Sequence, residues 1–86
     1  HLAGNVILIL PLLMTSPFLS VVIPAYNESL RLPHTLGRCI AFLENWSETW
    51  EILVVDDGSV DDTAALVDRF HARDERIRVL RLPHAG

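Results

Sequence analysis

Short apolar runs alternate with amphipathic stretches along this chain. Phe18–Ile23 and Glu51–Val55 are mostly β-branched or aliphatic runs of strand length, and Ile77–Leu82 mixes aliphatic residues with arginines, so each run is typical of a strand. Between these runs, apolar residues recur at helical spacing from about Pro33 to Asn45 and from Asp61 to Ala72. The pattern therefore predicts the element order β-α-β-α-β.

This order predicts a Rossmann-like α/β fold with a parallel sheet, because strands joined by helices run parallel and their crossovers are right-handed. We expect Ile77–Leu82 to lie at a sheet edge, with its aliphatic residues inward and Arg78 and Arg81 outward. The loops that follow the first two strands must then leave the same carboxyl edge. Open α/β sheets bind their ligands at that edge.

An apolar run, Val6–Met14, precedes the first predicted strand. It is shorter than the roughly 20 residues of a membrane-spanning helix, and Pro11 interrupts it. It could be a leader, the stub of a membrane anchor or the core of a signal peptide. A signal peptide is disfavoured because no basic residue precedes the run and no clear cleavage site follows it. We assign residues 1–16 to a leader or anchor stub outside the fold and residues 17–86 to the domain, which leaves membrane association open.

The composition fits one small domain with a buried core. Of 86 residues, half are hydrophobic, and the mean hydropathy is +0.31, which excludes a disordered chain. The net charge of −4 and the absence of a basic stripe argue against nucleic acid as a partner. Cys39 is the single cysteine and forms no internal disulfide, so a reducing compartment is expected, either the cytoplasm or the cytoplasmic face of a membrane.

Two polar segments follow the first two predicted strands, Pro24–Glu28 and Asp56–Ser59. Together they offer an aromatic ring, an amide and three carboxylates. An aromatic ring that stacks on a base contributes about 1–3 kcal/mol, and a carboxylate accepts hydrogen bonds from base N–H groups or ribose hydroxyls. We interpret the adjacent acids of the second segment, which should repel each other, as kept for a ligand or cation. The two segments predict a nucleotide site.

Other interpretations of these residues remain open. Asp61 and Ser59 could simply cap the second helix, and Tyr26 could be a half-buried anchor of its loop. The chain has no Gly-x-Gly-x-x-Gly after the first strand and no Gly-Lys-Ser/Thr, which excludes a dinucleotide fingerprint and a P-loop.

Two motifs resemble the start of glycosyltransferase family 2, at the family's spacing and over about residues 18–86. They read Leu-Ser-Val-Val-Ile-Pro-Ala-Tyr-Asn-Glu over residues 19–28 and Val-Val-Asp-Asp-Gly-Ser-Val-Asp-Asp-Thr over residues 54–63. Arg31-Leu32-Pro33, and Arg78-Val79-Leu80 before a Pro-His-Ala-Gly sequence, resemble the branch that makes polyprenyl- or dolichyl-phosphate glucose.

The resemblance implies a partial GT-A domain that binds a nucleotide-diphosphate sugar, with UDP-glucose as the expected donor and a polyprenyl or dolichyl phosphate as the expected acceptor. It implies that Pro24, Tyr26 and Glu28 line the nucleoside pocket and that Asp56 and Asp57 contact the base and ribose. It also implies a divalent metal, Mg or Mn, and a catalytic base, whose motifs lie outside these residues. We therefore expect the chain to hold the donor half of an inverting enzyme and to be inactive alone.

Three alternatives remain at this point. The chain could belong to a family 2 transferase that acts on a polysaccharide or another glycan. It could instead be a receiver-type signalling domain, because Ile52–Asp57 also resembles the start of that fold, although the phosphorylated aspartate would then fall beyond the chain. It could also be a nucleotide-binding module without catalysis.

Overall fold

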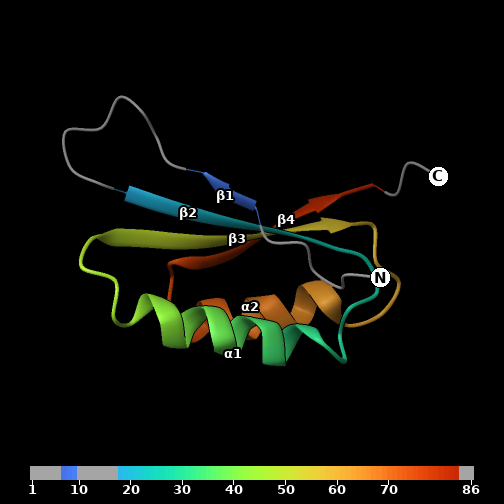
Figure 1. Cartoon of the computed structure of the whole chain (residues 1–86). Coiled ribbons are helices and arrows are strands. Elements are labelled where there is room, and N and C mark those ends of the chain that lie inside the picture. Colours follow the sequence, from blue (N-terminus) through green and yellow to red (C-terminus); the bar gives the residue numbers. More distant parts are fainter. Residues whose placement is uncertain (1–6, 10–17, 84–86) are drawn as a thin grey trace.

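The computed structural model describes residues 7–9 and 18–83. Along the chain the elements are β1 (Ile7–Ile9), β2 (Phe18–Ala25), α1 (Leu32–Leu43), β3 (Thr49–Asp57), α2 (Thr63–Arg73) and β4 (Ile77–Leu82) (Figure 1). From β2 onward the order is β-α-β-α-β, which confirms the Rossmann-like α/β prediction.

The described strands form one sheet with the spatial order β1-β2-β3-β4. β2, β3 and β4 are parallel neighbours, and β1 pairs with β2 in the antiparallel direction. Both helices cover the same face of the sheet (Figure 1). Two right-handed crossovers that step in the same direction along a sheet place their helices on one side, which accounts for this arrangement.

The hydrophobic core lies between the helices and the sheet. In β3 every second residue from Trp50 to Asp56 is buried, as expected when successive side chains of a strand point to opposite faces. The core consists of Leu19, Val21, Ile23, Ala25, Leu32, Leu36, Leu43, Trp50, Ile52, Val54, Val67 and Ile77. Because β2 and β3 supply most of these residues, their carboxyl ends rest on the best-packed part of the molecule.

Both central strands are longer than predicted. β2 continues through Pro24 to Ala25, and β3 continues to Asp57. Pro24 is tolerated because it lies past Val22, the last residue of β2 that pairs with β1, so its missing N–H removes no hydrogen bond of that pairing. Residues predicted to lie in loops are therefore held by the sheet.

The helix boundaries differ from the prediction by one or two residues. α1 begins at Leu32, with Pro33 in its first turn as expected, and it ends at Leu43. α2 begins at Thr63 rather than at Asp61. Residue 61 is therefore part of the loop before α2.

One expectation about the apolar leader was wrong. Ile7–Ile9 forms β1 and pairs with β2 in a register that places Ile7 beside Val22. These three residues thus belong to the sheet, where they satisfy backbone groups that an exposed edge would leave open. The other residues of the 1–16 segment, including Pro11, lie outside the described part of the chain, and their role stays a prediction. No helix among the described residues is both long and apolar enough to cross a membrane.

β4 lies at an edge of the described sheet, as predicted, with Ile77 inward and Arg78 outward as expected, but its last three residues differ from the expectation. The guanidinium of Arg81 donates to Asp68 of α2 at 2.6 Å, so Arg81 lies on the helix-covered face. Leu80 and Leu82 lie on the opposite face and are 47% and 42% exposed. The strict two-residue period of a strand sets this pattern. We name the face of the sheet opposite the helices the open face, because no described element packs on it.

Candidate functional site

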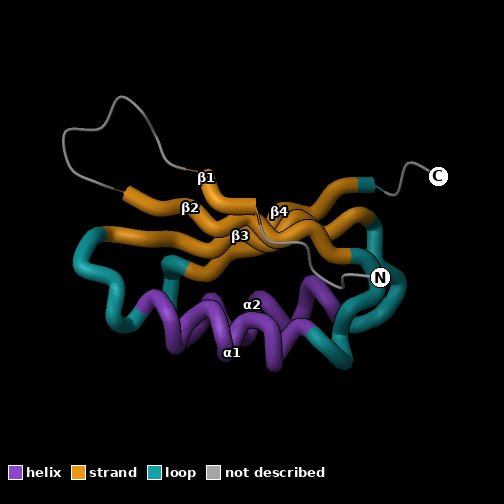
Figure 2. The backbone as a smooth tube through the Cα atoms, in the orientation of Figure 1, coloured by secondary structure: helices purple, strands orange, loops and turns teal. Residues whose placement is uncertain are grey.

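The two predicted site loops leave the same edge of the sheet. The β2–β3 register places Ala25 beside Asp56, so both strands end at one level. The loop after β2 covers residues 26–31, and the loop after β3 covers residues 58–62 (Figure 2). The prediction that β2 and β3 are parallel and present these loops at one carboxyl edge is confirmed.

The adjacent acids Asp56 and Asp57 point to opposite faces of the sheet, because both lie in β3. Asp56 is only 4% exposed and points toward the helices. Its Oδ1 accepts a hydrogen bond from the backbone N–H of Ser59 at 3.3 Å and a second, short one from the hydroxyl of Ser59. Gly58 makes this tight turn possible with a φ of 72°, in the left-handed region.

This geometry changes the interpretation of the acid pair. Mutual repulsion does not require a shared ligand or cation, since the two carboxylates diverge and Ser59 already donates twice to Asp56. Asp57 is half-buried on the open face, the face that Pro24 also shares. Of the two acids, only Asp57 therefore lies on the open face.

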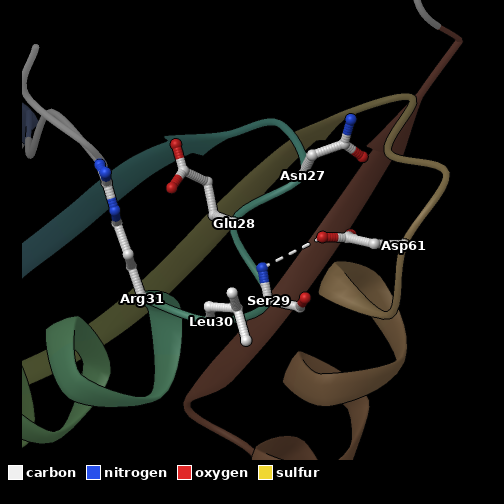
Figure 3. A pocket seen from close by; sticks show the side chains of 6 residues that line it. All are labelled: Asn27, Glu28, Ser29, Leu30, Arg31 and Asp61. Atoms are coloured by element: carbon white, nitrogen blue, oxygen red, sulfur yellow. Dashed lines mark hydrogen bonds between the residues drawn. The ribbon is translucent and has the colours of Figure 1, made fainter.

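The remaining predicted site residues follow directly on β2. Pro24 is exposed at the end of the strand, Tyr26 is 42% exposed and Glu28 is half-buried. Glu28, Arg31 and Asp61 belong to the lining of a cavity of about 420 Å³ (Figure 3). The structure thus places all five predicted residues at one edge of the sheet, with Asp56 on the face opposite to Pro24 and Asp57.

The two loops are hydrogen-bonded to each other. Among the described residues, three hydrogen bonds cross between them and a fourth joins the first loop to Thr63, the first residue of α2. We name these four bonds the loop clasp. It consists of the bonds from Asn27 N–H to Ser59 Oγ (2.8 Å), Glu28 N–H to Thr63 Oγ1 (2.9 Å), Ser29 N–H to Asp61 Oδ2 (3.2 Å) and Val60 N–H to Asn27 Oδ1 (2.9 Å). The bond between Ser29 and Asp61 is drawn in Figure 3.

Asn27 occupies the bend of the first loop. Its φ of 50° lies in the left-handed region, which asparagine tolerates better than most residues. Its backbone N–H donates to Ser59, and its side-chain oxygen accepts from Val60, so this one residue contacts the second loop twice.

Asp61 does more than cap α2. Its Oδ1 accepts from the backbone N–H of Thr63 at 2.9 Å and from the hydroxyl of Thr63, while its Oδ2 accepts from Ser29 in the other loop. These bonds favour the charged carboxylate, and the bond from the Thr63 hydroxyl is the largest of the causes that lower the pKa of Asp61 to about 2. The interpretation of Asp61 as a plain cap was therefore incomplete, and Ser59 contacts Asp56 and Asn27 instead of capping the helix.

Sequence reasoning missed the part played by Asn27 and Thr63. A signal was present for each. An asparagine directly after a strand-ending segment is typical of a left-handed bend, and an Asp-x-Thr sequence before a helix is typical of local side-chain to backbone hydrogen bonds. Neither signal reveals that the bonds join two loops more than 30 positions apart.

The described residues do not provide a metal site. Within them, no group of three or more His, Cys, Asp or Glu side chains could hold an ion. The divalent metal, Mg or Mn, therefore stays an expectation that rests on the family resemblance.

The three parallel strands, the helices on one face and the joined polar loops at the carboxyl edge define a Rossmann-like unit that is consistent with part of a GT-A domain. The family model described as "Glycosyl transferase family 2" matches residues 20–86. The chain therefore belongs to glycosyltransferase family 2, which removes the receiver-type alternative.

Curated relatives point to one branch of this family. The chain is 44% identical to the dolichyl-phosphate beta-glucosyltransferase of Drosophila melanogaster, over 84% of this chain and 25% of the relative. It is 43% identical to the protein of the same name from Dictyostelium discoideum, over 76% of this chain and 22% of the relative.

A bacterial relative is also similar. The undecaprenyl-phosphate 4-deoxy-4-formamido-L-arabinose transferase of Sodalis glossinidius is 47% identical, over 63% of this chain and 18% of the relative. The chain thus spans about a quarter or less of the length of the curated relatives it matches. No solved structure matched the chain.

Proposed function

We propose that this chain is the donor-nucleotide-binding part of an inverting glycosyltransferase that transfers a sugar, with UDP-glucose as the first candidate donor, to a dolichyl or polyprenyl phosphate. Membership of family 2 and the names of the relatives, which specify glucosyl transfer and lipid phosphates, support this proposal. The observation that carries it is that Asp57, at the end of β3, and Tyr26, directly after β2, lie at one carboxyl edge of a sheet whose central strands are packed in the core.

In this proposal each exposed group at the edge has a defined contact. The ring of Tyr26 stacks on the base, and Pro24, which is exposed near the end of β2, lines the nucleoside pocket. Asp57 accepts hydrogen bonds from the base or the ribose, and Glu28 faces the nucleoside from the first loop. Asp56 supports the turn of the second loop through Ser59 and makes no direct contact with the ligand.

The loop clasp restricts where the diphosphate can bind. Backbone N–H groups often bind phosphate oxygens, but the N–H groups of Asn27, Glu28 and Ser29 already donate to side-chain oxygens of the second loop and of Thr63. The diphosphate must therefore be held by groups other than these three amides. The divalent ion expected from the family would offset its charge.

The proposed transfer forms one bond and breaks one. An oxygen of the acceptor phosphate bonds to the anomeric carbon while the bond from that carbon to the diphosphate breaks, and the nucleoside diphosphate leaves with the electron pair. We propose that the protein acts in the cytoplasm or at the cytoplasmic face of a membrane, where the lipid phosphate is accessible. The half-buried thiol of Cys39, whose pKa is raised by burial, is compatible with a reducing compartment.

Titration calorimetry with UDP, GDP and ADP tests the binding part of this proposal. We expect UDP to bind most tightly and Asp57→Asn to weaken it by roughly tenfold, because a lost hydrogen bond to a desolvated partner costs about 1–3 kcal/mol. Asp62→Asn is the matched control, since Asp62 is exposed and makes no side-chain capping bond. Equal affinity for the three nucleotides, or no binding of any, would contradict the proposal.

A transfer assay tests the remainder. We expect the 86-residue chain to bind nucleotide yet to transfer no glucose from UDP-glucose to dolichyl phosphate, because the metal motif and base are expected elsewhere in the enzyme. Turnover by the purified chain would show that the missing parts were assigned wrongly.

A further inference from the structure

Three successive N–H groups of the first site loop all donate to side-chain oxygens that follow β3. The acceptors are Ser59 Oγ for residue 27, Thr63 Oγ1 for residue 28 and Asp61 Oδ2 for residue 29. Two of these acceptors are themselves linked, since the Thr63 hydroxyl donates to Asp61 Oδ1. A run of successive backbone N–H groups that converge on one carboxylate and two hydroxyls is an anion-binding arrangement that the protein fills with its own side chains.

Thr63 is the centre of this arrangement. Its side chain is fully buried, and its single hydroxyl both accepts from Glu28 and donates to Asp61. Removal of the hydroxyl would leave the Glu28 N–H without its acceptor and would remove one of the donors to Asp61 Oδ1. Since Thr63 is the first residue of α2, the first loop is anchored directly to a packed helix.

We propose that Thr63 and Asp61 are positioning residues for nucleotide binding, which hold the loop of Tyr26 and Glu28 in the conformation that meets the base. This inference rests on the proposed function. The two residues act through the backbone of the first loop and do not touch the ligand. Without the clasp the loop samples several conformations, and the apparent dissociation constant rises in inverse proportion to the fraction that is competent to bind.

The test uses isosteric and conservative variants of the buried threonine. Thr63→Val keeps the volume but loses the hydroxyl, and Thr63→Ser keeps the hydroxyl. We expect Thr63→Val to weaken UDP binding by about tenfold in titration calorimetry, which corresponds to a drop of the binding-competent fraction to about a tenth. We expect the UDP affinity of Thr63→Ser to stay within about twofold of that of the unchanged protein. Binding is measured well below the melting temperature of each variant, and Asp62→Asn again serves as the charge control.

A double-mutant cycle separates positioning from general destabilisation. Tyr26→Ala removes the ring through which the clasp is proposed to act, so Thr63→Val should have a clearly smaller effect on UDP affinity in that background. Asp61→Ala, a change at an exposed side chain, gives a second route to the same result if the buried variant does not fold. It should also weaken UDP binding by about tenfold.

Two results would overturn the positioning role. One is UDP affinity unchanged in both Thr63→Val and Asp61→Ala. The other is an equal loss in the presence and absence of the Tyr26 ring. Failure of the unchanged protein to bind any nucleotide would instead refute the proposed function, so the two failures are distinguishable.

Discussion

Asn27 allows the strength of the loop clasp to be measured with three substitutions at one site. Its left-handed φ of 50° and its side-chain bond to Val60 are separate contributions to stability. Asn27→Asp keeps an acceptor in a residue that tolerates this conformation. Asn27→Gly keeps the conformation and loses the acceptor, and Asn27→Ala loses both.

The expected magnitudes follow from these two features. The exposed bond from Val60 N–H, 2.9 Å long, contributes about 0.5–1.5 kcal/mol net to the free energy of unfolding. A side chain with a Cβ in the left-handed region costs about 1–2 kcal/mol, which glycine avoids. We therefore expect Asn27→Asp to be close to neutral, Asn27→Gly to lose about 1 kcal/mol and Asn27→Ala to lose about 2 kcal/mol or more.

Thermal unfolding followed by circular dichroism measures this order directly. For a domain of this size, each 1 kcal/mol shifts the melting temperature by about 4–8 °C, so the alanine and glycine variants are resolved from each other. If Asn27→Ala and Asn27→Gly were equally stable, the backbone conformation would contribute nothing. If Asn27→Asp were as unstable as Asn27→Ala, the bond to Val60 would not depend on an acceptor at this position, and the description of the clasp would be refuted.

Three further predictions concern acidic residues. Asp57→Asn should weaken UDP binding more than Asp61→Asn, because Asp57 is proposed to contact the ligand itself, whereas an asparagine at position 61 can still accept at the start of α2 about as well as an aspartate. Calorimetry at fixed divalent ion compares them, and an equal or larger loss at Asp61 would refute this order. The pKa of Asp61 is lowered to about 2, so its contribution to stability is complete above about pH 4 and is lost as pH falls toward 2. Asp61→Asn should therefore reduce the pH dependence of the free energy of unfolding, measured in urea, over that range. An unchanged pH dependence would contradict this prediction. Hydrogen bonds from Ser20, and then from Arg78, lower the pKa of Glu51, so Ser20→Ala should raise that pKa in a carboxyl NMR titration, and no upward shift would contradict the cause.

Much of the fold could be predicted from local patterns. The strands with buried aliphatic residues, such as Val54 and Ile52, and the helix that opens with Pro33 were all recognisable, because burial on one face imposes a period on the sequence. β1 was missed because three apolar residues in a longer apolar run carry no period of their own. Their pairing with β2, on the side opposite β3, becomes visible only in the folded sheet.

The candidate site was predictable in composition but not in direction. The sequence shows that Asp56 and Asp57 are adjacent. Their side chains point in opposite directions only because β3 continues through both residues, and the sequence does not show whether the strand ends before them. The bonds from Ser29 to Asp61 and from Glu28 to Thr63 depend on the register of two strands and on the exact start of α2. These long-range features are set by packing and leave no local signal.

The loop clasp also has a consequence for protein engineering. The backbone N–H groups of Asn27, Glu28 and Ser29 all donate to side-chain oxygens of the second motif, so the first loop and the second motif depend on each other. A chimaera that imports the first loop from a distant transferase would bring donors whose acceptors are spaced for another partner. Libraries aimed at new donor specificity should therefore exchange residues 26–31 and 58–63 as one unit and diversify only the side chains that face the ligand, such as Tyr26.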